Sequence, residues 1–386
     1  MERPMIVRIG GNIVSPLGLT ARENYEAVKS GRSALRLYEG RWGLPEPFVG
    51  SLFEDGFIDS AFSVIGDASC YTAFEKALIL SVAGAVAEAG IDASSSDTLF
   101  IVSTTKGNVS LLDDGESPHI GRERLLLGCA AETVSRFFGN PRQPLVVSNA
   151  CISGVCAQVA AMRMLESGAC RYAIVAGCDI QSKFIVSGFQ SFKALSSMPC
   201  RPYHKGRDGL NLGEAAATII YARTEEVGTD DWTVCKAAVR NDANHISGPS
   251  RTGEGSFRAL RAVVSPDNRS RLAFVNAHGT ATAYNDEMES IAIMRAGLSE
   301  VPVNGLKGYY GHTMGAAGLL ETLVSMYAID DATILGTRGY SECGVSHPLD
   351  ISPENRSTER RAFVKLLSGF GGCNAALLLA KGGEKW

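Results

Sequence analysis

The segment VVSNACISGVCAQVAAM, residues 146–162, changes character at Cys151. Residues 144–148 contain a run of apolar, β-branched side chains, which predicts a short buried strand. Residues 153–165 are rich in Ala, Met, Gln and Val, which predicts a helix, and Gly168 stands where that helix would end. A cysteine thus occupies the turn of a strand–turn–helix junction.

Position alone leaves two interpretations of Cys151 open. The first N–H groups of a helix are unpaired and carry the positive end of its dipole. We expect this field to lower the pKa of the thiol and to make it a nucleophilic thiolate, in the geometry that hydrolases use for serine. Free cysteine is, however, among the most buried residue types, so an inert structural thiol is the alternative.

The composition favours a globular enzyme of the cytoplasm. The chain has 386 residues, of which 45% are hydrophobic and 20% charged. A formal net charge of -4 argues against general nucleic-acid binding. The most apolar long stretch, residues 77–91, is shorter than a membrane span and contains Glu88, which favours a buried helix. Ten cysteines without a C-x-x-C pair indicate reduced thiols and neither a disulfide framework nor a zinc site.

Strand and helix patterns alternate along the whole chain, which predicts a layered α/β architecture. Thr20 and Glu23 form a capping box for a helix that ends near Gly31. The strands are expected at residues 5–9, 98–103, 145–148, 173–176, 232–239, 272–276 and 301–304, and further helices at 71–89, 286–296 and 315–329.

A faint internal echo suggests two similar halves. LVVSNAC (145–151) resembles LAFVNAH (272–278), and GEAAATIIYA (213–222) resembles GGCNAALLLA (371–380). The two pairs have different spacings, so an insertion is needed, and short apolar strings recur by chance.

Two histidines lie in glycine-rich turns after apolar runs. His278 is in NAHGTATAYND and His312 in GLKGYYGHTMGAAG. A lone histidine is more often a hydrogen-bonded structural residue, but two of them with Cys151 could supply a nucleophile and two imidazole donors or bases. A metal site is less expected, because the spacings are long and no H-E-x-x-H motif occurs.

The segment SGFGGCNAALLLAK, residues 368–381, is not a dinucleotide fingerprint, because its glycines precede a strand and not a helix. Its turn could place backbone N–H groups against an oxyanion. A tight glycine turn before the last strand is the simpler alternative.

Four motifs in order, NACISG, VNAHGTATAYND, LKGYYGHTMGAAGLLE and GFGGCNA, resemble the β-ketoacyl-acyl-carrier-protein synthase family. These are the elongating condensing enzymes of fatty acid and polyketide synthesis. GNIVSPLG and RPYHKGRDGLNLGEAA also resemble it, so the likeness covers nearly the whole chain. The resemblance implies the thiolase fold, with two similar α/β halves stacked in five layers (α-β-α-β-α). Residues 1–224 would carry the cysteine and residues 225–386 the two histidines.

The resemblance also implies a role for each matching residue. Cys151 is the expected nucleophile, and His278 and His312 the pair that supports malonyl decarboxylation and stabilises the enolate. Lys307 is expected to support the site, and Glu321 to form a structural ion pair. Phe370 is the expected gate beside the thiol, and its N–H and that of Cys151 the expected oxyanion hole.

The implied reaction is a decarboxylative Claisen condensation of an enzyme-bound acyl group with malonyl-carrier protein, in fatty acid, polyketide or polyene-type synthesis. No cofactor and no metal are implied. The expected partners are an acyl carrier protein and a second subunit, in a homodimer or a heterodimer, with no nucleic acid and no membrane. Arg122, Arg124 and Arg142 are candidates for a basic patch that receives the acidic carrier, or else are scattered solvated charges.

Four rival functions remain. A non-catalytic subunit like the chain-length factors would lack the active cysteine, which this chain keeps. A starter-type synthase would be expected to carry Asn at the position of His312, and a thiolase another cysteine. A cysteine hydrolase is disfavoured, because two histidine donors without an orienting Asn or Asp suit enolate chemistry better.

Overall fold

A sheet of ten strands organises the computed structural model, which describes residues 4–113, 120–245, 248–383 and 386. The strand order is β11-β10-β14-β15-β9-β1-β8-β6-β4-β5. In chain order these strands are β1 (Met5–Val14), β4 (Thr98–Ser103), β5 (Leu145–Val147), β6 (Tyr172–Asp179), β8 (Ala215–Thr224), β9 (Trp232–Asn241), β10 (Phe274–Asn276), β11 (Val303–Asn304), β14 (Ala362–Gly369) and β15 (Cys373–Lys381). Two small sheets are formed by β2 (Arg36–Tyr38), β3 (Phe48–Ser51) and β7 (Leu212–Gly213), and by β12 (Thr333–Ile334) and β13 (Arg356–Ser357).

The large sheet consists of two groups with the same topology. Outward from the central pair of β1 and β9, one group runs β1-β8-β6-β4-β5 and the other β9-β15-β14-β10-β11. In each group the first three strands of this order are antiparallel and the last two are added in parallel. The strands of both groups follow one another along the chain in the same order, so the two halves have the same topology.

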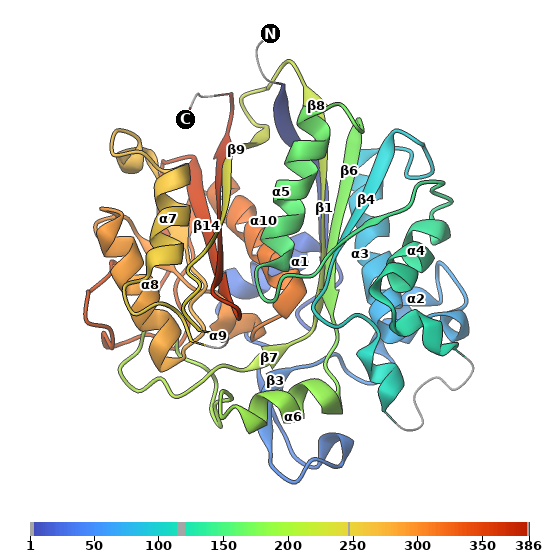
Figure 1. Cartoon of the computed structure of the whole chain (residues 1–386), viewed down its shortest axis with the longest axis horizontal. Helices are drawn as coiled ribbons and strands as arrows, with labels where there is room; N and C mark the ends of the chain where they lie inside the picture. The colour runs from blue at the N-terminus through green and yellow to red at the C-terminus, as the bar shows by residue number, and fades with distance from the viewer. Residues whose placement is uncertain (1–3, 114–119, 246–247, 384–385) are drawn as a thin grey trace.

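Helices cover both groups and fill the space between them (Figure 1). α3 and α4 lie outside the first group, α7 and α8 outside the second, and α5 and α10 lie between the two. The predicted five-layer α-β-α-β-α arrangement is therefore confirmed. The helices are α1 (Ala21–Lys29), α2 (Phe57–Phe62), α3 (Ala73–Ala89), α4 (Leu127–Phe137), α5 (Ser153–Glu166), α6 (Lys183–Ser191), α7 (Glu254–Val263), α8 (Ala283–Arg295), α9 (Lys307–Tyr310) and α10 (Ala317–Asp330).

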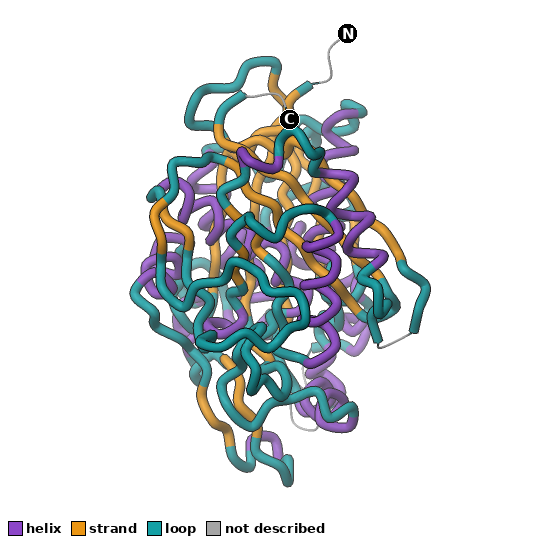
Figure 2. The backbone as a smooth tube through the Cα atoms, turned by 90° about the vertical axis from the view of Figure 1, so that its left-hand side faces the viewer, coloured by secondary structure: helices purple, strands orange, loops and turns teal. Residues whose placement is uncertain are grey.

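The helix boundaries follow from local chemistry. Thr20 and Glu23 form the predicted capping box of α1, in which each side chain bonds the other's backbone N–H. α3 ends at Gly90, which adopts the left-handed conformation with φ +62°. Within the described ranges, no helix combines the length and the apolar character that crossing a membrane requires. Both termini lie at one end of the molecule (Figure 2).

The strand topology corrects part of the internal echo. β8 and β15 occupy equivalent places in their groups, as the resemblance of residues 213–222 to 371–380 predicts. β5 and β10 do not, because β5 lies at the outer edge of its group and its equivalent is β11. The other similarity, between residues 145–151 and 272–278, is therefore not part of the repeat. The division at residue 224, which falls between β8 and β9, stays a prediction.

β5 is not the buried strand that its sequence predicts. It lies at the edge of the sheet, and its one described neighbour is β4. Leu145 is consequently 38% exposed, and the two valines that follow are half-buried. An apolar run predicts that a strand will be buried, but it does not show whether residues of the same chain or of another chain bury it.

The middle layer explains the glycine that follows Cys151. α5 and α10 pack against each other, and a Cβ at Gly154 would lie 2.9 Å from the carbonyl oxygen of Gly315 and 3.2 Å from Cα of Gly318. A Cβ at Gly318 would in turn lie 2.6 Å from the backbone nitrogen of Val155. Only glycine allows the two helices to approach this closely. The approach brings together the starts of α5 and α10, one from each half.

Candidate active site

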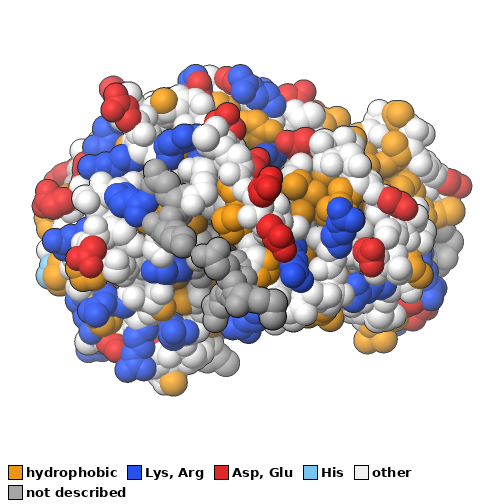
Figure 3. Space-filling view, turned by 90° about the horizontal axis from the view of Figure 1, so that it is seen from above, with side chains coloured by type: hydrophobic (Ala, Val, Ile, Leu, Met, Phe, Trp, Pro, Cys, Tyr) orange, Lys and Arg blue, Asp and Glu red, His pale blue; other side chains and the backbone are white. Residues whose placement is uncertain are grey.

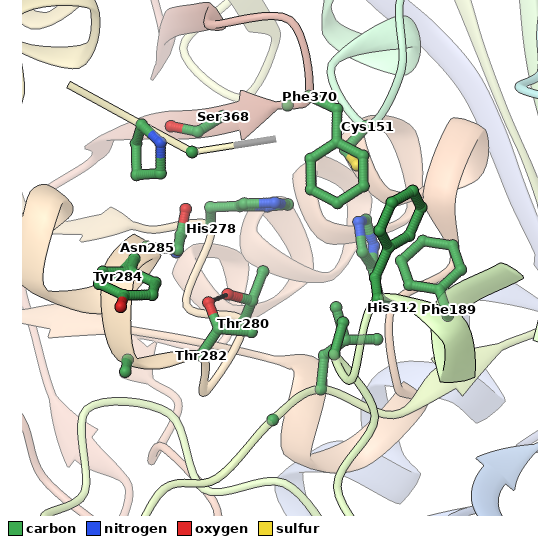
Figure 4. A pocket seen from close by; sticks show the side chains of 18 of the residues that line it. Cys151, Phe189, His278, Thr280, Thr282, Tyr284, Asn285, His312, Ser368 and Phe370 are labelled. Atoms are coloured by element: carbon green, nitrogen blue, oxygen red, sulfur yellow. Dashed lines mark hydrogen bonds between the residues drawn. The ribbon is translucent and has the colours of Figure 1, made fainter. Parts of the chain in front are cut away.

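Cys151, His278 and His312 meet where the two halves join. Cys151 follows β5 at the start of α5, His278 follows β10, and His312 lies between α9 and α10. The sulfur and one nitrogen of each ring lie within 4.8 Å of one another, and the two rings are 5.0 Å apart between centroids at 81°. Figure 4 shows the three side chains converging on one pocket. The predicted trio is thus a spatial cluster, although its members are far apart in sequence.

The pocket that reaches this cluster has a volume of about 420 Å³. Three aromatic side chains, Phe189, Phe192 and Phe370, form part of its wall. The hydroxyl oxygens of Thr280 and Thr282 lie 2.9 Å apart in the same wall. Other lining residues are Lys193, Ala194, Asp208, Gly209, Leu210, Gly248, Pro249, Ala283, Tyr284, Asn285, Ser368, Gly369 and Gly372.

The backbone around Cys151 is shaped for close contacts. Ala150 has a φ of +45°, a conformation that a residue with a Cβ adopts at a cost and that occurs at active sites. The N–H groups of Phe370 and of Cys151 itself both act on the sulfur. A Cβ at Gly369 would lie 3.2 Å from the nitrogen of Cys151 and 2.9 Å from Sγ of Cys373, so this position requires glycine. Two N–H donors therefore converge beside the thiol, which is the arrangement of an oxyanion hole.

The expected ionisation of the thiol is wrong. Burial raises the pKa of Cys151 to about 11, while the charge of Lys307 and the N–H of Phe370 act in the opposite direction. The loss of water outweighs the charge of Lys307 and the two N–H groups, so the thiol is protonated at neutral pH. A nearby base has to accept its proton when the sulfur attacks.

Both histidines are neutral in this environment. Burial lowers the pKa of each well below its ordinary value, and the charges of Lys307 and Lys365 lower it further. The N–H of Met314 donates to Nδ1 of His312 at 3.2 Å, so the ring hydrogen of His312 is on Nε2. Nε2 of His312 and Nδ1 of His278 are buried without a partner among the described residues. His312 is therefore a donor toward the pocket, and His278 has a nitrogen that can accept a proton.

Beneath the histidines lies a buried cluster of two lysines and one glutamate. Lys307 donates to Oε1 of Glu321 at 2.8 Å and to the carbonyl oxygen of His278 at 2.6 Å. Lys365 of β14 binds the other oxygen of the same carboxylate. Burial opposes ionisation of Glu321, but the two lysines bring its pKa below its ordinary value. Lys307 and Glu321 were predicted, whereas Lys365 was missed, and a single lysine inside the apolar strand AFVKLLSG was the signal.

Two further buried carboxylates hold the loops of the site. Glu289 of α8 accepts the N–H groups of His278 and Gly279, both at 2.7 Å. Asp179 at the end of β6 accepts the N–H of Gly315 at 2.7 Å and the hydroxyl of Thr104 at 2.7 Å. Sequence reasoning missed both carboxylates. An acidic residue directly after an apolar strand, as in YAIVAGCD, was the available signal for Asp179.

Phe370 lies in the turn between β14 and β15. Its ring is 41% exposed and contacts the rings of Phe189 and Phe192, each at 6.1 Å between centroids. Gly371 has a φ of +87° and open space around its Cα, whereas Gly369 is tightly packed. The turn therefore has room to rearrange at Gly371 but not at Gly369. The role of Phe370 as a gate stays a prediction.

Cys151, His278 and His312 also form a set of ligand atoms that could bind a zinc ion. The buried ammonium groups of Lys307 and Lys365 lie next to this set and disfavour a cation there. The absence of a metal and of a cofactor stays a prediction.

Of the three arginines that are candidates for carrier binding, Arg124 and Arg142 have other contacts, and the role of Arg122 stays a prediction. Arg124 forms an ion pair with the buried Glu75 at 2.5 Å, and Arg142 donates to the carbonyl oxygens of Ser96 and Ala169. Many Lys and Arg side chains gather on the face at the end with the termini (Figure 3). α6, which contributes Phe189 to the pocket, lies at the opposite end (Figure 1). Arg124 and Arg142 are thus part of the scaffold.

Comparisons with known proteins identify the family of this chain. The N-terminal domain of the β-ketoacyl synthase family matches residues 4–226, and its C-terminal domain matches residues 233–341. The 3-oxoacyl-[acyl-carrier-protein] synthase 2 of Vibrio harveyi is 24% identical over 99% of both chains. A putative polyketide β-ketoacyl synthase of Streptomyces halstedii is 26% identical over 98% of both.

The solved structure of the ishigamide ketosynthase/chain length factor has the same fold, with a TM-score of 0.86 and 23% identity over 99% of this chain and 100% of that chain. The thiolase-like fold predicted from the sequence is thereby confirmed, and so is the resemblance carried by the four motifs. The chain belongs to the β-ketoacyl synthase family, a family of condensing acyltransferases.

Proposed function

We propose that the cluster of Cys151, His278 and His312 carries out a decarboxylative Claisen condensation between an acyl group on Cys151 and malonyl-carrier protein. The observation that carries this proposal is the convergence of one thiol, two neutral imidazoles and two backbone N–H groups within one pocket. A nucleophile beside preorganised donors is what acyl transfer requires.

In the first step the sulfur of Cys151 attacks the thioester carbon of an acyl-carrier protein. The thiol proton passes to an imidazole, for which Nδ1 of His278 is available. The C–S bond to the carrier then breaks, the carrier thiol takes up the proton, and the acyl group remains on Cys151. The N–H groups of Cys151 and Phe370 stabilise the negative oxygen of the tetrahedral intermediate.

In the second step malonyl-carrier protein enters and loses carbon dioxide. The electrons of the broken C–C bond form an enolate, whose oxygen is negative and needs donors. The Nε2–H of His312 supplies one, because Nδ1 already accepts from Met314, and a ring N–H of His278 supplies the other. The enolate carbon then attacks the acyl carbon on Cys151 and a C–C bond forms. The C–S bond to Cys151 breaks, and the sulfur leaves as a thiolate that takes up a proton from water.

A carrier protein delivers its substrates on a flexible arm, and the pocket provides a path for such an arm. The hydroxyl groups of Thr280 and Thr282 can bond its amides. Lys193 is exposed and lines the pocket, which makes it our candidate for receiving an acidic carrier. Lys193→Glu should raise KM for the carrier substrate, and an unchanged KM would place the docking surface elsewhere.

We place the subunit contact at the edge strand β5. Leu145 of this strand is 38% exposed, and Leu126, which precedes the neighbouring α4, is 65% exposed. An unpaired edge with apolar side chains is a pairing site. Two structural neighbours contain a ketosynthase and a chain length factor, which supports a dimer but not a particular contact. Analytical ultracentrifugation of Leu145→Glu tests it, because the variant should dissociate.

The non-catalytic subunit is the rival that the site disfavours, since the chain keeps the thiol and both imidazoles together. The cytoplasmic location stays a prediction. A reconstituted assay decides between the two functions: the chain is mixed with acyl- and malonyl-carrier protein, and carbon dioxide and the 3-oxoacyl product are quantified. We expect both in equal amounts, and neither would be formed by a non-catalytic subunit on its own.

A further inference from the structure

The steps above give no role to the buried charge of Lys365. Lys365 lies in the middle of β14, opposite Asn276 of β10 in the sheet register, and its side chain is 0% exposed. A lysine is almost never fully buried unless it is paired. Its surroundings therefore show what the charge is for.

Four acceptors surround the ammonium group of Lys365. They are Oδ1 of Asn276 at 2.6 Å, the carbonyl oxygens of Ala277 at 3.3 Å and Asn276 at 3.4 Å, and the carboxylate of Glu321. An ammonium group has three hydrogens to donate, so the protonated form has a complete set of partners. Burial acts against this form and lowers the pKa of Lys365 to about 8, while Glu321 acts in its favour.

Lys365 and Lys307 together form a clamp on the chain that leads to His278. Lys365 holds the carbonyl oxygen of Ala277, Lys307 holds that of His278, and Glu321 binds both lysines. From the other side Glu289 accepts the N–H of His278. The backbone of this histidine is therefore fixed by groups from α8, α9, α10 and β14.

The cluster also places two positive charges beneath the two imidazoles. Both ammonium groups bind the carboxylate of Glu321. Glu289 of α8 is the further ionisable group that acts on Lys365. The positive charge disfavours protonation of His278 and His312, and it favours a negative oxygen in the pocket above them.

We propose that Lys365 is a positioning residue for the decarboxylation step, which holds the Ala277–His278 backbone and, with Lys307, supplies positive charge that disfavours protonation of both imidazoles and favours the enolate. The inference rests on the proposed function of the site. Lys365 does not line the pocket and touches no substrate, so it acts through His278, Glu321 and Lys307.

The test measures decarboxylation of malonyl-carrier protein without an acyl donor, over about pH 5 to 10, for the native chain and for Lys365→Met. In the native chain kcat should fall above about pH 8, because Lys365 then loses its proton. Cys151, with a pKa of about 11, titrates outside most of this range. Lys365→Met should lower kcat by on the order of 10- to 100-fold, the effect of one charged hydrogen bond, with little change in KM.

Two features of the pH profile separate this role from a merely structural one. In Lys365→Met the decrease above pH 8 should disappear, and a decrease on the acid side should appear at higher pH because the imidazoles gain protons more readily. The matched control is Lys381→Met. It removes the same charge from the neighbouring strand β15, where Lys381 pairs with Asp330 at 2.8 Å near the surface, and it should leave both kcat and the profile unchanged.

A folded Lys365→Met that keeps native kcat and the native profile would overturn the inference. If Lys365→Met does not fold, the native profile decides, because a rate that stays constant from neutral pH up to pH 10 would show that the charge is not used. A native chain that releases no carbon dioxide at any pH would instead contradict the proposed function, and the role of Lys365 with it.

Discussion

The backbone N–H of Met314 donates to Nδ1 of His312 at 3.2 Å, and this bond assigns the ring hydrogen to Nε2, on the side of the pocket. A backbone N–H only two residues after His312 thus determines which nitrogen of its ring donates and which accepts. His278 has no such constraint on Nδ1. The two histidines are therefore not equivalent: His312 is a fixed donor, whereas His278 can exchange a proton.

The first prediction follows from this difference. His312→Ala should lower malonyl decarboxylation by about 10²- to 10³-fold, the usual effect of losing one donor to a developing oxyanion. Its effect on acylation of Cys151 should be smaller than that of His278→Ala, because His278 takes the thiol proton. Acylation is followed by intact mass and decarboxylation by release of carbon dioxide. Equal effects of the two variants on both steps would contradict the division of roles.

The second prediction concerns the resting state of the thiol. Because burial raises the pKa of Cys151 to about 11, the thiolate fraction grows about tenfold for each pH unit below that value. The rate of alkylation of Cys151 by iodoacetamide should therefore rise continuously from neutral pH to about pH 10. The rate is read from the mass of the peptide that contains Cys151. A rate that levels off near neutral pH would show instead that the field of α5 dominates.

The third prediction concerns the packing of α5 on α10. Gly154→Ala should destabilise the chain by about 1–3 kcal/mol, because the new Cβ would lie 2.9 Å from the carbonyl oxygen of Gly315. The matched control is Gly188→Ala in α6, where a Cβ meets no atom within 4 Å and alanine favours the helix. Thermal unfolding should show a lower midpoint for the first variant and an equal or higher one for the second.

The fourth prediction concerns Phe370. Removing its ring leaves its N–H in place, so Phe370→Ala should still allow acylation of Cys151. The loss of the contacts with Phe189 and Phe192 should open the pocket to water and to malonyl substrates at the wrong time. The ratio of carbon dioxide to condensed product should then rise above that of the native chain. If the ratio is unchanged, Phe370 is a packing residue.

The sequence predicts the helix boundaries because capping boxes and terminal glycines mark them locally, as at Thr20 and Gly90. The arrangement in five layers follows from the family resemblance and not from these local signals. The sequence does not show which strands are neighbours. LVVSNAC and LAFVNAH are similar in sequence, yet β5 is an edge strand and β10 lies inside the sheet. The register of a strand and the neighbours that bury it are therefore decided by the whole fold.

The residues of the candidate site likewise differ in how far the sequence predicts them. Residues in turns, such as Cys151, His278 and His312, stand out because glycines and unusual spacing surround them. Lys365 and Glu289 lie inside regular elements and gain their meaning only from partners far away in the chain. The pKa of Cys151 was predicted in the wrong direction because a sequence reveals the start of a helix but not the depth of burial.

The most direct test of the account is the intact mass of the native chain and of Cys151→Ala after each is mixed with a panel of acyl-carrier thioesters. The native chain should gain the mass of one acyl group from at least one member of the panel, and Cys151→Ala should gain none while keeping its fold. An acyl group that still appears on Cys151→Ala, or a native chain that no thioester in the panel modifies, would contradict the account.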